Sequence, residues 1–177
     1  MKKITVTILF ILLSLQANSQ NTFYIGSKQY PATEKWQFEC DSGIDRSPNI
    51  FIAKGINEGL FVISTETIFP YYIAGNLLIY LEDGSIITCL DKRIRDEVND
   101  TKTSVYKLTM NEVAKLTNSR INSVRFNLYY KHSNEKLSFI AKNYKHDYTY
   151  FPSGSPNKKN KLYYETDIEI KEIFQTQ

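Results

Sequence analysis

The chain has 177 residues, of which 42% are hydrophobic and 23% are charged, and its formal net charge is +3. This composition excludes an intrinsically disordered chain, and the length suits a single domain. Lys2 and Lys3 lie in an apparent leader, so residues 20–177 hold 20 basic and 19 acidic side chains. A charge so close to neutral would not attract nucleic acid or an anionic membrane, and neither partner is predicted.

The first nineteen residues have the pattern of a secretory signal peptide. Two lysines precede an apolar stretch of twelve residues, 4–15, and the small residues Ala17 and Ser19 follow where a signal peptidase reads. Twelve residues are too few for a membrane span, which needs about 20. Gln20 stands where a lipoprotein would have a cysteine. We expect cleavage before Gln20, no transmembrane anchor afterwards, and a periplasmic or secreted protein with one domain, residues 20–177.

Three apolar stretches in the first half predict strands: residues 36–40, 50–53 and 60–65. The clearest local signal is a hairpin formed by residues 77–82 and 85–90. Asp83-Gly84 between them suits a two-residue type I′ turn. Such a turn would pair Leu81 with Ile86 and Tyr80 with Ile87. Both faces of the hairpin are then apolar, which predicts strands inside a sheet that is covered on both sides.

The segment after this hairpin is polar. Its acidic and amide side chains are Asp91, Asp96, Glu97, Asn99 and Asp100, and three basic residues lie among them. The acidic side chains could attract calcium, but the Asp-x-Asp-x-Asp-Gly spacing of a calcium loop is missing. We therefore expect a salt-bridged loop. His132 and His146 are fourteen residues apart and have no zinc-ligand spacing, so neither a metal nor a cofactor is predicted.

A strand at residues 103–108 is expected to lead into a short helix. Thr109 and Glu112 have the spacing of a capping box, and Met110, Val113 and Leu116 form an apolar stripe at helical spacing.

The next strand alternates along its length. Val124, Phe126, Leu128 and Tyr130 should face the core, whereas Arg125, Asn127 and Tyr129 should face the half-solvated side. Together with the preceding elements, this order predicts an α+β fold: a mostly antiparallel sheet with a short helix packed on one side.

The C-terminal part is less regular. Residues 137–141 and 144–151 resemble strands, and residues 152–156 have the composition of a loop. Thr166 and Glu169 could cap a closing helix whose Ile170, Ile173 and Phe174 face the sheet. The alternation of Ile168 and Ile170 also permits a strand, and helix is the preferred interpretation.

Residues 73–126 contain a buried strand, a Tyr-Leu-Glu-Asp-Gly-Ser hairpin, a Tyr-x-Leu-Thr helix start and an Ile-x-x-Val-Arg-Phe strand. This pattern resembles that of small exported proteins of Bacteroidota-type bacteria, as does the leader with a small residue before Gln20. The resemblance covers about a third of the chain. It implies the compartment and the fold, and it implies no activity and no catalytic residues.

Two cysteines in an exported protein suggest a disulfide. Alternation points both Cys40 and Cys89 inward, which a Cys40–Cys89 bond requires and which two buried thiols also satisfy. Both interpretations stay open.

Catalytic patterns are missing. No Gly-x-Ser-x-Gly elbow occurs, and the turn requirement explains the adjacent carboxylates of Glu82 and Asp83. We therefore predict a non-catalytic domain, with a weak hydrolase as an alternative.

The thirteen tyrosines are the remaining signal. Tyrosine provides a large rigid contact area in recognition surfaces, although it also simply suits strands. The candidate binding residues are Tyr129, Arg125, Tyr148 and Tyr150, and the predicted partner is an unknown protein or an envelope glycan. Two specific functions fit this prediction: a periplasmic immunity or inhibitor protein, and a glycan-binding module.

Overall fold

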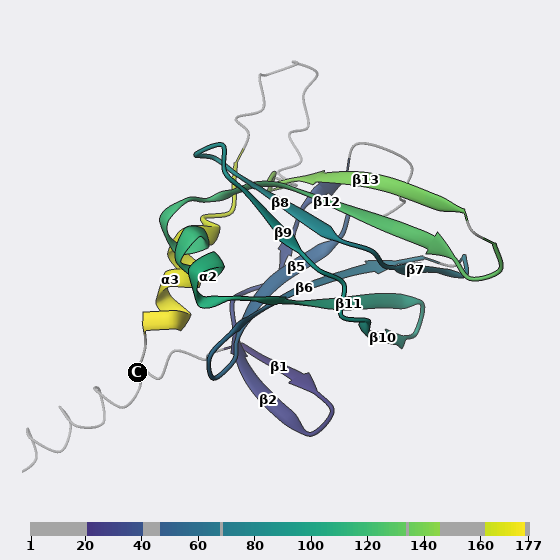
Figure 1. Ribbon diagram of the computed structural model, residues 1–177, viewed down its shortest axis with the longest axis horizontal. Helices are drawn as coiled ribbons and strands as arrows, with labels where there is room; N and C mark the ends of the chain where they lie inside the picture. Colours follow the sequence, from purple (N-terminus) through teal and green to yellow (C-terminus); the bar gives the residue numbers. More distant parts are fainter. Residues whose placement is uncertain (1–20, 41–46, 68, 134, 146–161, 176–177) are drawn as a thin grey trace, which may run out of the picture.

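The computed structural model describes residues 21–40, 47–67, 69–133, 135–145 and 162–175 (Figure 1). Two antiparallel sheets and two helices make up this part of the chain. The seven-stranded sheet, here called sheet A, consists of β1 (Asn21–Ile25), β2 (Lys28–Ala32), β3 (Trp36–Gln37), β5 (Asn49–Lys54), β6 (Gly59–Glu66), β10 (Ile94–Val98) and β11 (Thr101–Leu108). The six-stranded sheet, sheet B, consists of β4 (Glu39–Cys40), β7 (Tyr71–Ile73), β8 (Leu77–Leu81), β9 (Ile86–Cys89), β12 (Ile121–Tyr130) and β13 (Lys136–Lys142). The helices are α2 (Met110–Asn118) and α3 (Thr166–Gln175).

The two sheets pack face to face and share one apolar core. Sheet A runs β1-β2-β5-β6-β11-β10 with β3 beside β5, and sheet B runs β4-β13-β12-β8-β9 with β7 beside β12. The inner faces bury alternate residues of strands such as β8 and β9, as expected where one face of a strand is covered. The largest fully buried side chains are Trp36, Tyr106, Phe38, Phe61 and Phe126. The mostly antiparallel, β-rich architecture is therefore confirmed.

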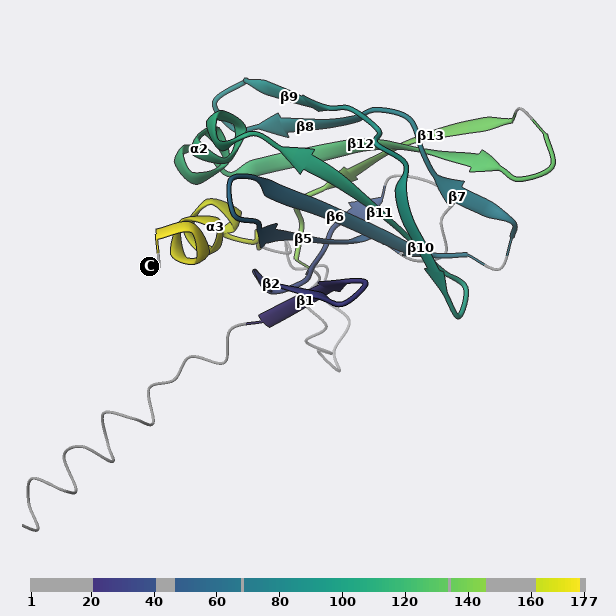
Figure 2. The same ribbon diagram turned by 60° about the horizontal axis from the view of Figure 1, so that its bottom comes forward.

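The helices lie together at one end of the sandwich (Figure 2). Val113 and Leu116 of α2 and Ile170 and Ile173 of α3 belong to the shared core. A short helix was expected on one side of a sheet. In the structure it belongs to a pair of helices, which closes one end of the core.

A third layer covers part of the outer face of sheet A. The β1–β2 hairpin pairs with β5 only through Ala32 and Ala53, and beyond that point it leaves the plane of the sheet. It folds over a second apolar cluster, formed by Ala32, Phe51, Ala53, Leu60, Val62 and Val105, with Phe23, Ile25, Tyr30 and Ile94 packed against it. This curling gives sheet A a concave outer face.

The β8–β9 hairpin forms in a different register from the predicted one. Ile79 pairs with Ile87 and Tyr80 with Ile86, because the loop has three residues, Glu82 to Gly84. Only Gly84 of these has a positive φ (+84°), and the Gly84 N–H donates to the carbonyl oxygen of Leu81 at 3.1 Å. The predicted type I′ turn at Asp83-Gly84 is therefore wrong.

The change of one residue moves every side chain of β9 to the opposite face. Ile87 and Cys89 are buried, while Ile86 is 52% exposed. The prediction of a sheet covered on both sides is also wrong at this hairpin.

Residues 36–40 form two short strands in different sheets, not one strand. Trp36 pairs with Ile50 in sheet A, and Cys40 pairs with Ala141 in sheet B. Phe38 lies between them, fully buried, and its N–H donates to the Pro48 carbonyl at 3.1 Å. The chain crosses the core here, which alternation alone cannot reveal.

The expected loop at residues 91–100 contains strand β10, whose partly or fully exposed residues give no apolar periodicity. Asn99 and Asp100 both have positive φ, +46° and +62°, and Val98 pairs with Thr101 across them. The type I′ geometry that was expected at Asp83-Gly84 thus occurs here. Of the three basic residues expected to form salt bridges in this segment, Arg95 pairs with Asp91. Glu97 pairs instead with Lys102, outside the segment, which was not predicted.

The helix starts differ in how well the sequence predicted them. At α2 the capping box is present: the Glu112 N–H donates to Thr109 Oγ1 at 3.3 Å, and the Thr109 N–H donates to the Glu112 carboxylate at 2.7 Å. Met110, placed in the apolar stripe, is 48% exposed.

At α3 the expected Thr166–Glu169 cap does not form. The Thr166 hydroxyl accepts from the Ile121 N–H at 2.9 Å, and the Glu169 carboxylate accepts from the Trp36 indole N–H at 3.0 Å. Tertiary partners therefore replace the local cap.

Most of the predicted strand at residues 144–151 lies outside the described residues. Lys145 forms an isolated bridge with Leu162.

Candidate functional site

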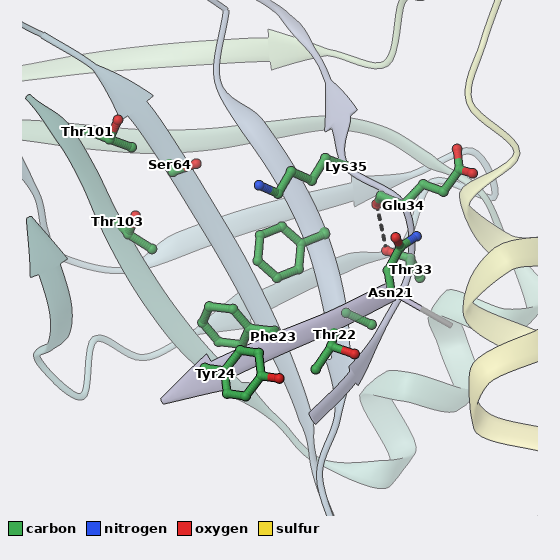
Figure 3. A pocket seen from close by; sticks show the side chains of 12 residues that line it. Asn21, Thr22, Phe23, Tyr24, Thr33, Glu34, Lys35, Ser64, Thr101 and Thr103 are labelled. Atoms are coloured by element: carbon green, nitrogen blue, oxygen red, sulfur yellow. Dashed lines mark hydrogen bonds between the residues drawn. The ribbon is translucent and has the colours of Figure 1, made fainter. Parts of the chain in front are cut away.

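A cavity lies between the β1–β2 hairpin and the concave face of sheet A (Figure 3). Its volume is about 700 Å³, within the range of roughly 300–1,000 Å³ that is usual for ligand sites. We call this cavity the groove. Its lining consists of hydroxyl, amide, aromatic and charged side chains together with one alanine: Asn21, Thr22, Phe23, Tyr24, Ala32, Thr33, Glu34, Lys35, Phe51, Ser64, Thr101 and Thr103.

Two phenylalanines form the floor of the groove. Phe23 of β1 and Phe51 of β5 pack edge to face, with ring centroids 5.0 Å apart. This contact holds the hairpin over the sheet, and the second apolar cluster continues from it beneath the hairpin. Tyr24, at the rim, is 60% exposed.

Short hydroxyl side chains form one wall. Thr103 of β11 and Ser64 of β6 are direct cross-strand partners, and Thr101 lies two residues from Thr103 on the same face. Each hydroxyl can donate one hydrogen bond and accept two. In Figure 3 all three stand on the side of the groove opposite Thr33 and Glu34.

The connection from β2 to β3 forms the other wall, and Thr33 fixes its course. Thr33 is buried; its hydroxyl accepts from the Ile52 N–H at 3.1 Å and donates to the Glu34 carbonyl at 2.9 Å. The fully buried Trp36 fixes the other end of this short connection. Glu34 and Lys35 are therefore held between two buried anchors.

The two charged side chains of this wall point in opposite directions. The Lys35 ammonium extends into the groove, whereas the Glu34 carboxylate points away from it, toward α3 (Figure 3). Near α3, burial raises the pKa of Glu169, and the charge of Glu34 adds to that rise against the hydrogen bond from Trp36. The groove itself thus holds a cation without a carboxylate directed into it.

This arrangement is suited to binding. The drawn side chains offer a cation, several hydroxyls and aromatic rings, which can form hydrogen bonds to a ligand and pack against it. No residue of the groove belongs to a recognised motif, which is why sequence reasoning missed it. The one available signal was Gly26-Ser27, a two-residue hairpin turn with Gly26 at φ +59°.

The candidate residues named from the sequence lie elsewhere. Arg125 and Tyr129 share the outer face of sheet B, as alternation predicted, and Arg125 is exposed. Tyr129 is half-buried: its ring lies 6.1 Å from that of Tyr72. Tyr148 and Tyr150 lie outside the described residues. A binding role for these four residues stays a prediction.

Tyr129 also helps to hold the corner between β7 and β8. A Cβ atom on Gly75, whose φ is +73°, would lie 3.3 Å from the Tyr129 hydroxyl and 3.4 Å from the Asn127 amide. The Gly75 N–H donates to the Asp91 carboxylate at 2.8 Å, and the Tyr106 hydroxyl donates to the Gly75 carbonyl at 3.0 Å. Tyr129 therefore has a packing function whether or not it contacts a partner.

The structure does not join Cys40 and Cys89 in a disulfide. They lie on β4 and β9, the two ends of the strand order of sheet B, so four spacings of about 4.8 Å separate their strands. A disulfide needs Cα atoms within about 7 Å of each other. Burial raises the pKa of the Cys89 thiol to about 12, which makes it a poor nucleophile.

The possible calcium ligands have other partners. The Asp91 carboxylate accepts from the N–H groups of Gly75 and Arg93 and pairs with Arg95, and the Glu97 carboxylate pairs with Lys102 and Lys131. Within the described ranges, no group of three or more His, Cys, Asp or Glu side chains is placed to hold a metal. His132 is exposed, and His146 lies outside those ranges.

No family model, curated protein or solved structure matches the chain. The resemblance to small exported proteins stays a prediction. Among the described helices, none combines the length and apolar character that crossing a membrane would require.

Proposed function

We propose that the protein is exported and acts as a non-catalytic domain that recognises a component of the cell envelope through the groove. The observation that carries this proposal is the groove itself: a cavity of about 700 Å³ with an aromatic floor, a hydroxyl wall and an inward-pointing ammonium. Concave sites with aromatic surface and a few convergent polar groups are typical of ligand binding.

The leader supports the location. Residues 1–19 combine two lysines, a twelve-residue apolar stretch and small residues at the −3 and −1 positions. Chemical sequencing of the protein recovered from the periplasm or medium of its native host should start at Gln20. Recovery of the intact chain from the cytosol would contradict export.

The groove can be tested by filling it. Ser64→Trp places a large side chain into the groove, whereas Thr88→Trp adds the same side chain to the exposed outer face of sheet B. Both variants should unfold cooperatively near the wild-type temperature. We expect Ser64→Trp to weaken saturable binding to solubilised envelope fractions, glycan and protein measured separately, by tenfold or more, and Thr88→Trp to leave it unchanged.

Two outcomes would overturn this proposal. Equal binding by the wild type and Ser64→Trp would show that the groove is not the site. Turnover of an ester, peptide or glycan substrate, abolished by substitution of one serine or carboxylate, would show that the domain is an enzyme.

A second candidate function is that of an inhibitor or immunity protein that binds another protein through the outer face of sheet B. Ile86 and Ile140 are 52% and 43% exposed on this face, and Arg125 pairs with Ile140 and Leu78 across it. Exposed apolar residues beside arginine and tyrosine are common in protein interfaces. Loss of protein binding in Thr88→Trp, with retention in Ser64→Trp, would favour this function.

A further inference from the structure

We infer that the groove binds an acidic sugar, a uronic-acid unit of an oligosaccharide, with its carboxylate on Lys35, its ring on the aromatic floor and its hydroxyls on the wall of Ser64, Thr101 and Thr103. This inference rests on the proposed function, because it names the ligand class of the same groove.

The aromatic floor suits the apolar face of a sugar ring. Phe23 and Phe51 meet edge to face at 5.0 Å, and Tyr24 stands at the rim with 60% of its surface exposed. A pyranose ring has C–H bonds on its faces, which pack against aromatic rings, and hydroxyls around its edge. Because Phe51 is only 7% exposed, the half-buried Phe23 and the exposed Tyr24 provide the aromatic surface against which one face of a sugar ring would pack.

The hydroxyl wall suits the edge of the same ring. Ser64 and Thr103 are cross-strand partners, and Thr101 is on the same face of β11, so three hydroxyls lie close together on one face of the sheet. Each hydroxyl is both a donor and an acceptor, as sugar hydroxyls are. A fatty acid would place methylene groups against this wall. The hydroxyls of Ser64, Thr101 and Thr103 would then form no hydrogen bonds with the ligand.

The charge selects an acidic sugar over a neutral one. The Lys35 ammonium points into the groove, and the neighbouring Glu34 carboxylate points away from it (Figure 3). Lys35 is not part of a salt bridge in the described part of the chain. A carboxylate on the sugar ring would supply the opposite charge and form a charge-assisted hydrogen bond.

Trigalacturonate and its methyl ester provide a matched pair of probes, because esterification removes the negative charge and keeps the ring and its hydroxyls. Calorimetric titration of the mature chain should show the acid binding about tenfold more tightly than the ester, a difference that shrinks at high salt. Decanoate serves as the apolar anion.

Lys35→Gln should weaken binding of the acid about tenfold and leave the ester unaffected. Lys28→Gln is the control, because Lys28 is an exposed lysine on the same hairpin and does not line the groove. Thr103→Val, which removes a hydroxyl at nearly constant volume, should weaken binding of the acid and the ester alike. Thermal unfolding of each variant establishes that it is folded.

The failure of this inference is distinguishable from that of the proposed function. Equal binding of the acid and the ester, or binding of decanoate alone, would overturn the acidic-sugar inference, while Ser64→Trp sensitivity would keep the groove as the site. No binding of trigalacturonate at millimolar concentration would also overturn the inference. If, in addition, envelope binding proved insensitive to Ser64→Trp, the proposed function would fail too.

Discussion

The outer faces of the two sheets are built from strands of similar length but differ in what lies against them. On sheet A, the β1–β2 hairpin covers Val62, which is fully buried, and leaves the groove at its edge. On sheet B, Ile86 and Ile140 remain about half exposed at equivalent outward positions. A hairpin joined to β5 by one backbone pair and by the Phe23–Phe51 contact therefore produces both a second core and a cavity, and neither follows from the strands beneath it.

The same substitution on both outer faces should show this difference most strongly. Val62→Asp places a carboxylate under the hairpin and should lower the free energy of unfolding by about 3–5 kcal/mol. Ile86→Asp places it in solvent and should lower that free energy by about 1 kcal/mol or less. Urea denaturation of both variants measures the effect. Equal losses would mean that the hairpin does not cover sheet A in solution.

Substitutions at two glycines test whether Tyr129, on the outer face of sheet B, has a packing function. Gly75 and Gly84 both have positive φ, but only Gly75 has neighbours within 4 Å of an added Cβ. Gly84→Ala should cost about 1 kcal/mol for the backbone conformation. Gly75→Ala should cost about 1 kcal/mol more, because the Tyr129 hydroxyl and the Asn127 amide must move. Identical unfolding midpoints would argue against this contact.

The contact between the groove wall and α3 should make a contribution to stability that depends weakly on pH. The pKa of Glu169 is raised in the folded state, mainly by burial, so the folded protein binds this proton more tightly than the unfolded chain does. Its contribution to stability is therefore present at low pH and is lost as the pH rises from about 4.3, the unfolded value, through the raised folded value.

Glu169→Gln should remove this dependence and match or exceed wild-type stability at pH 7, by less than about 1 kcal/mol, because Glu169 is only half-buried. The Gln oxygen can still accept from the Trp36 indole. Stability curves of both proteins from pH 4 to 7 provide the measurement. If the free energy of unfolding of the wild type rose with pH while that of Glu169→Gln stayed constant, this prediction would be contradicted.

The last prediction is that a reductant has no effect on stability. Because Cys40 and Cys89 lie at opposite ends of the strand order of sheet B, a reductant should not change the unfolding temperature. Loss of a disulfide would cost about 2–5 kcal/mol, which is several degrees in a domain of this size. Alkylation of the unfolded, unreduced chain should modify both thiols. An unalkylated chain whose mass is lower by two hydrogen atoms would show a bond.

Much of the fold could be predicted where the signal is local. The apolar stretches at β5 and β6, the alternation along β12 and the Thr109–Glu112 box at α2 each correspond to the element that they predicted. The errors share a cause. The β8–β9 register, the split at Phe38 and the α3 start all depend on partners far away in the sequence, such as Ser119 for Asp83 and Ile121 for Thr166.

The candidate site was predictable to a much smaller extent. Thr, Ser and Lys are common surface residues, and nothing in their spacing indicates that Lys35, Ser64 and Thr103 line one cavity. Their proximity arises because β2 and β6 flank β5, β11 lies beside β6, and the hairpin folds over this face of the sheet. The tyrosine excess directed attention to sheet B, where Tyr129 fills a corner.

The amino-acid sequence by itself determined the strand-rich character, the helix start at Thr109 and the pattern of an export leader, because hydrophobic periodicity, capping and leader composition act over a few neighbouring residues. Only the tertiary structure decided the strand registers, the separation of the two cysteines and the position of the groove. These features depend on which faces are buried when distant segments meet, and burial is a property of the assembled chain.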